Sequence, residues 1–94
     1  MIEYQEKYKQ FIIGKGVGSN DKVANSVKSY ISYLNSVSKY LAIKISPQTL
    51  RTTNDIKSLS DQLTGLVSQK TIKNYGSAMK QYVSMVRELG LPIS

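Results

Sequence analysis

The fold of this chain is decided by residues 68–89, which read SQKTIKNYGSAMKQYVSMVREL. Apolar residues recur here at intervals of three and four, the repeat that places side chains on one face of an α-helix. They are Ile72, Tyr75, Met79, Tyr82, Val86 and Leu89. Ser68 is a favourable N-cap, and Gly90 followed by Pro92 ends the pattern. The spacing therefore predicts a long amphipathic helix.

The opposite face of this predicted helix is basic. Its residues follow the same rhythm about half a turn away: Lys70, Lys73, Ser77, Lys80, Ser84 and Arg87. Only Glu88, at the far end, lies near them with the opposite sign. A helix that packs with one face and presents an even positive stripe with the other favours binding to a polyanion.

Length and composition restrict the other possibilities. The 94 residues are enough for a single domain, residues 1–94, with one modest core. Thirteen Lys and Arg against six Asp and Glu give a net charge of +7, which suits nucleic acid or an anionic surface. The chain has no cysteine, and no apolar run approaches the ~18 residues of a membrane span. Glu3 and Glu6 argue against a signal peptide, so a cytoplasmic location is expected.

Three further helical segments are predicted. Residues 2–13 carry Tyr4, Tyr8, Phe11 and Ile12 at helical spacing and stop at Gly14. Ser19 or Asn20 caps a second long helix over residues 21–41, whose stripe is Val23, Val27, Tyr30, Leu34, Val37 and Leu41. Ser46-Pro47 opens a short helical turn through Leu50. Thr53 or Asn54 caps the next helix, which turns Ile56, Leu59 and Leu63 inward and ends at Gly65.

The two long helices resemble each other when the sequence is shifted by 49 residues. Ser19 then falls on Ser68, Val23 on Ile72, Asn25 on Asn74, Tyr33 on Tyr82 and Val37 on Val86. This similarity suggests two similar helical hairpins. We therefore expect an all-α fold, a compact bundle of four to five helices without strands.

The outer face of the second helix is rich in small polar groups. It holds Asn25, Lys28, Ser32, Asn35, Ser36 and Lys39. Serine and asparagine let a phosphate backbone approach and hydrogen-bond to it, although a merely solvated surface would look the same. Residues 21–46 and 69–94 each carry a charge of +3, whereas Arg51 and Lys57 are balanced by Asp55 and Asp61. Positive charge is thus concentrated on the two long helices.

The residues commonly used in catalysis are scarce. There is no histidine or cysteine, and the six acids are scattered, which removes the usual bases, nucleophiles and metal ligands. Tyr30, Tyr75 and Tyr82 lie in apolar stripes, and two arginines are too few to support a tyrosine nucleophile on a phosphate. We expect this chain by itself not to be an enzyme, and to need no cofactor and no metal.

A family resemblance is carried by Ser68-x-x-Thr71-Ile72-x-x-Tyr75-x-x-x-Met79-x-x-Tyr82-Val83. This string resembles the SAM-like, core-binding N-terminal domain of phage integrases and tyrosine recombinases. It is also similar to a helical module that precedes the nuclease domain in some restriction-type endonucleases, where the pattern occurs near both ends. Residues 27–34 and 73–82 match those two occurrences. The resemblance implies a bundle that clamps duplex DNA from one side, with a separate C-terminal catalytic domain.

The combined expectation is non-covalent binding of double-stranded DNA by a basic helical face, with no membrane association. The resemblance places Lys70, Thr71, Lys73 and Asn74 on the part of the helix that approaches DNA. The full set of predicted DNA-binding residues is Lys70, Thr71, Lys73, Asn74, Ser77, Lys80, Arg87, Lys28 and Lys39. The alternative is a protein-interaction or dimerisation module that uses exposed Tyr33 and Tyr40. That alternative involves no DNA binding, whereas the first interpretation leaves a homo-oligomer on DNA open.

Overall fold

The computed structural model describes residues 2–15 and 27–91, which form four helices. They are α1 (Gln5–Gly14), α2 (Val27–Leu41), α3 (Thr53–Leu63) and α4 (Gln69–Leu89). Within these described ranges there is no strand, only two isolated β-bridges. The predicted all-α bundle is confirmed.

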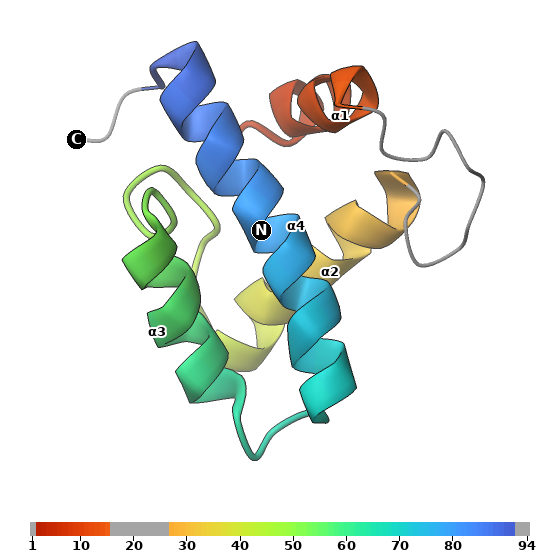
Figure 1. Cartoon of the computed structure of the whole chain (residues 1–94), viewed down its shortest axis with the longest axis vertical. Coiled ribbons are helices and arrows are strands. Elements are labelled where there is room, and N and C mark those ends of the chain that lie inside the picture. Colours follow the sequence, from red (N-terminus) through yellow and green to blue (C-terminus); the bar gives the residue numbers. More distant parts are fainter. Residues whose placement is uncertain (1, 16–26, 92–94) are drawn as a thin grey trace.

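Helix α4 is the centre of the bundle. It contacts each of the other helices and packs most extensively against α2. Figure 1 shows α4 crossing in front of α2, with α3 on one side and α1 on the other. Consecutive helices also pack against each other, α1 with α2, α2 with α3 and α3 with α4.

The core is built from the apolar faces of all four helices. Its fully buried side chains include Tyr8, Ile12, Leu34, Val37, Leu63, Met79, Tyr82 and Met85. Most of the stripe predicted for residues 72–86 is therefore confirmed as core. The prediction was wrong for Leu89, which is 51% exposed. At this end of α4 no described element covers Leu89, which instead lines an open hollow beside α1.

Both predicted ends of α4 are confirmed. Ser68 has an extended backbone, and its hydroxyl accepts a hydrogen bond from the Thr71 N–H at 3.2 Å. Gly90 adopts the left-handed conformation, with φ of 61°, and its N–H donates to the Val86 carbonyl. Glycine adopts this conformation without the steric penalty of a Cβ. Pro92 lies outside the described residues.

The N-cap of α3 is Thr52, so the prediction of Thr53 or Asn54 was wrong. The Asp55 N–H donates to the Thr52 hydroxyl at 3.3 Å, and the Thr52 N–H donates to the Asp55 carboxylate at 3.2 Å. This reciprocal capping box requires, three residues after the cap, a side chain such as a carboxylate that can accept from the N-cap N–H. Of the three candidates, only Thr52 has one.

Helix α1 begins at Gln5 rather than Ile2. Ile2 is buried and forms a parallel bridge with Ile45, and the Glu3 N–H donates to the Ile45 carbonyl at 2.7 Å. After this pairing the chain turns at Glu3 and Tyr4, and Tyr4 has a left-handed backbone with φ of 60°, so the helix begins only at Gln5. The predicted start of the second helix, with its Ser19 or Asn20 cap, lies outside the described residues. Its predicted end at Leu41 is confirmed.

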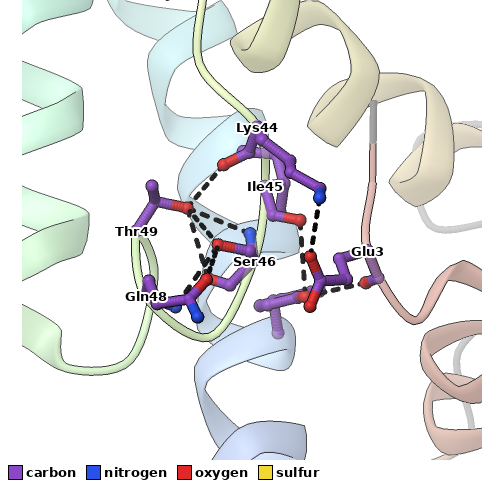
Figure 2. A network of polar contacts seen from close by, with 7 residues as sticks. Glu3, Lys44, Ile45, Ser46, Gln48 and Thr49 are labelled. Carbon is purple, nitrogen blue, oxygen red and sulfur yellow. Dashed lines mark hydrogen bonds and ion pairs between the residues drawn. The ribbon is translucent and has the colours of Figure 1, made fainter. Parts of the chain in front are cut away.

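The connector between α2 and α3 is fixed by a local polar network (Figure 2). The Ser46 carbonyl accepts from the Thr49 and Leu50 N–H groups at 3.1 and 2.9 Å, which confirms a single helical turn over residues 46–50. The Thr49 hydroxyl donates to the Lys44 carbonyl at 2.6 Å, and the Lys44 ammonium pairs with Glu3 at 2.9 Å. The network thereby joins the connector to the start of the chain.

Tyrosines form much of the packing around α4. The rings of Tyr8 and Tyr82 lie 5.7 Å apart, and Tyr33 lies between Tyr30 and Tyr75 with centroid distances of 6.1 and 5.5 Å. Tyr33 is consequently half-buried in the α2–α4 contact, so the expectation that it is exposed was wrong. Tyr40, by contrast, is 51% exposed.

Candidate nucleic-acid interface

The structure brings the predicted cations of α4 together on one outward face, here called the α4 strip: Lys70, Lys73, Ser77, Lys80, Ser84 and Arg87. The four cations and Ser77 are exposed, and Ser84 is half-buried. At a rise of 1.5 Å per residue, the strip extends about 25 Å from Lys70 to Arg87. A duplex of that length carries about 15 negative charges. The strip is therefore long enough for its four cations to contact several phosphates along one duplex.

The positive charge of the α4 strip is not neutralised by the described carboxylates. Within residues 2–15 and 27–91, no acid forms an ion pair with any of its four cations. Glu88, the nearest acid in the sequence, pairs instead with Lys15 of α1, with an N–O distance of 3.0 Å. The strip therefore retains its cationic character along its length.

Small residues lie between these cations. Gly76 is half-buried, and a Cβ built on it would meet nothing within 4 Å, so packing does not require a glycine there. The Ser77 hydroxyl folds back and donates to the Lys73 carbonyl at 3.3 Å. Few side-chain atoms therefore protrude between the lysines, which lets a phosphate backbone approach the helix closely.

Two of the predicted site residues, Thr71 and Asn74, lie at the edge of the strip and are half-buried. The Thr71 hydroxyl lies 2.9 Å from the Ser68 hydroxyl, which also accepts a hydrogen bond from the Thr71 backbone N–H. Thr71 thus takes part in starting the helix. The first N–H groups of a helix lack intrahelical partners, and Gln69 and Lys70 at this end are exposed.

The structure does not bring Lys28 and Lys39 to the α4 strip. Both are exposed on the outer face of α2, where they line a shallow hollow of about 350 Å³ with Ser32, Asn35 and Ser36. Helices α2 and α4 turn their buried stripes toward each other, so their outer faces point in opposite directions. Figure 1 agrees, because α4 lies in front of α2 in a view down the shortest axis. The predicted residues therefore form two separate surfaces.

Two features near α1 were not identified from the sequence. Lys9 lies beside Val27, Lys28 and Ile31, and these four residues line a second hollow next to the first. Phe11 and Leu89 line an apolar hollow of about 490 Å³ with three polar residues of α1. The exposed positions of α1 could be found by helical periodicity, but its orientation against α2 and α4 could not.

The described part of the chain was also searched for a metal site and for a membrane-spanning helix. No three acidic side chains gather there into a group that could hold a metal ion. None of the described helices has the length and hydrophobicity to cross a membrane. The prominent chemical feature of the described surface is its exposed positive charge.

Comparisons with protein families, with curated proteins and with solved structures found no match to this chain.

Proposed function

We propose that this protein binds duplex DNA non-covalently through the α4 strip, as the DNA-clamping module of a DNA-processing protein. The resemblance to integrase and restriction-endonuclease modules is the reason for proposing that class of parent protein, with catalysis in a separate C-terminal domain. The observation that carries the proposal is the row of four exposed cations on one helix face, none paired with a described carboxylate.

The chemistry of the strip fits a phosphate backbone. Its lysines and arginine supply point charges, and the small side chains between them allow close approach. The N-terminus of α4 adds the partial positive charge of a helix dipole, which favours a phosphate. These contacts are independent of sequence, and Asn74 at the edge of the strip is the residue placed best to reach a base.

The salt dependence of binding tests this mechanism. If four cations contact phosphates, the slope of log K against log salt is expected to be roughly −3 to −4. Lys73→Ala should weaken binding to all sequences and flatten the slope by about one unit. Asn74→Ala should instead change the preference among sequences. The measurement is the affinity for a short duplex by fluorescence anisotropy over a series of salt concentrations.

The matched control is Lys57→Ala, because Lys57 is also exposed on a helix but lies on α3 beside Asp55 and Asp61. It should leave both affinity and slope nearly unchanged. Equal and negligible effects of Lys73→Ala and Lys57→Ala would contradict binding through the α4 strip.

A second candidate function is protein interaction or dimerisation, and the hollow lined by Phe11 and Leu89 favours it. Leu89 is half exposed at its rim, and the half-buried Phe11 beside it belongs to the aromatic residues that are enriched in protein interfaces. Under this alternative, Leu89→Gln would abolish self-association or partner binding, whereas Lys73→Ala would not. Sedimentation of the two variants separates the candidates.

A further inference from the structure

The two hollows on the outer face of α2 form one continuous basic surface, here called the α2 trough. Lys28 and Ile31 line both hollows, so the trough runs from Lys9 of α1 along α2 to Lys39. At 1.5 Å per residue, Lys28 and Lys39 are about 17 Å apart along the helix axis. No described carboxylate lines either hollow, so the three lysines give the trough a positive charge.

The trough has the side chains of a phosphate-binding surface rather than those of a protein interface. Ser32, Asn35 and Ser36 lie between the lysines and can donate hydrogen bonds to phosphate oxygens. Its apolar lining consists of Ile31 and Val27, both half-buried, and no aromatic side chain lines it. Protein interfaces depend on buried aromatic or arginine anchors, and the trough offers neither. Charge complementarity therefore selects a nucleic acid as its occupant.

The trough and the α4 strip lie on opposite sides of the molecule. The shortest extent of the molecule is 20 Å, and along this direction α4 lies in front of α2 (Figure 1). One straight duplex cannot contact both faces, because each points away from the other. At physiological salt the Debye length is about 8 Å, so charges this far apart also act independently on their ligands.

We infer that the α2 trough is a second duplex-binding surface, so that one molecule holds two segments of DNA and bridges them. This inference rests on the proposed binding of a first duplex by the α4 strip. Bridging then requires no dimer, because both surfaces belong to one chain. It adds a function that a one-sided clamp would not have.

The test is the number of duplexes bound per protein. A fluorescent duplex of about one helical turn, ~10 base pairs, is titrated with the intact chain near physiological salt, and the complex is analysed by sedimentation equilibrium. We expect two duplexes per protein. In a parallel experiment, the protein should retain a labelled duplex on beads that carry an unlabelled one.

Two double variants assign the surfaces. Lys28→Ala with Lys39→Ala should reduce the stoichiometry to one and abolish retention on the beads. Affinity for the remaining duplex should change by less than about twofold, because the two faces share no side chain. Lys73→Ala with Lys80→Ala should remove the other duplex, and Lys57→Ala should keep both. All the altered side chains are exposed, so the variants should fold normally.

The outcomes separate this inference from the proposed function. One duplex per protein, lost only when α4 is altered, would overturn the second surface and leave the proposed function supported. One duplex per protein, lost only when the trough is altered, would overturn both bridging and binding through α4. Bridging that requires two protein molecules in the complex would also overturn the inference.

Discussion

Among single residues, Tyr82 connects the most distant parts of the chain. Its ring is fully buried against Tyr8, and its hydroxyl donates to the Glu3 carbonyl at 2.7 Å. The ring thus contributes apolar burial, while the hydroxyl holds the start of the chain against α4. Both contributions would be lost on truncation.

Tyr82→Ala is expected to destabilise the fold by roughly 3–5 kcal/mol, because a large cavity would replace the ring. Tyr82→Phe keeps the ring and loses the hydrogen bond, so its cost should be about 1 kcal/mol. Tyr40→Ala is the control, since Tyr40 is 51% exposed and its loss should change stability by less than about 0.5 kcal/mol. Urea denaturation gives all three values. A loss below about 1 kcal/mol for Tyr82→Ala would contradict the buried role.

Residue patterns allowed much of the structure to be predicted, and the failures have identifiable causes. The apolar spacing of α4 identified Tyr75, Met79, Tyr82 and Val86 as core, because helical periodicity follows directly from sequence. Leu89 belongs to the same stripe, but its exposure depends on which neighbours reach the end of the helix. Those neighbours are set by tertiary packing, which the spacing of residues along one helix does not reveal.

Among the helices, α4 combines the clearest start and stop signals with an apparent weakness at Gly76. Glycine in a helix interior costs about 0.5–1 kcal/mol relative to alanine, because it loses more backbone freedom on folding. The space around Gly76 is open, so no packing contact explains it. It lies next to Ser77 in the sequence and about one helical turn after Lys73, where a small residue favours close approach of a ligand.

Gly76→Ala is therefore expected to stabilise the protein by about 0.5–1 kcal/mol. Gly90→Ala provides a matched contrast, because its surroundings are equally open but its φ is 61°. An alanine there must adopt the left-handed conformation, which should cost about 1 kcal/mol or more. Thermal and urea denaturation measure both effects. If both variants were destabilised alike, φ would not be the deciding difference.

Helix boundaries were predictable where a cap is unambiguous and not where several residues compete. Ser68 and Gly90 delimit α4 as expected. For α3, Thr52, Thr53 and Asn54 all have capping side chains, and only the acid at Asp55 selects Thr52. That signal is present in the sequence. The start of α1 is different, since the bridge between Ile2 and Ile45 is a contact across more than forty residues.

Considered as a whole, the molecule is organised by the packing of α4 against α2, which leaves their two outer faces pointing in opposite directions. The sequence predicted that positive charge concentrates on the two long helices. It did not predict that packing of their apolar stripes would turn the two basic faces away from each other. A helical wheel gives the face of each helix relative to its own axis, whereas the relative orientation of two helices depends on how they pack.

The free energy of unfolding should fall at alkaline pH because of the buried tyrosine hydroxyls. Tyr8 is fully buried, and its hydroxyl donates to the Ala78 carbonyl at 2.9 Å, which joins α1 to α4. Burial raises the pKa of Tyr8, and that of Tyr82, above the ordinary value of 10.0. An unfolded tyrosine releases its proton near pH 10, whereas the folded protein keeps it. The stabilisation is therefore complete below about pH 10 and is lost as the pH rises further.

For Tyr8 alone, this linkage predicts a loss of about 1.4 kcal/mol between roughly pH 9 and pH 11. A comparison of the parent with a variant isolates the contribution of Tyr8, because all other groups are shared. Tyr8→Phe removes the titrating group and a hydrogen bond, and it should be less stable than the parent at neutral pH by about 1 kcal/mol. That deficit should shrink or reverse by about pH 11, because only the parent has a phenol to ionise on unfolding. If the deficit of Tyr8→Phe stayed constant across this range in urea denaturation, the Tyr8 phenol would not be the group that couples folding to alkaline pH.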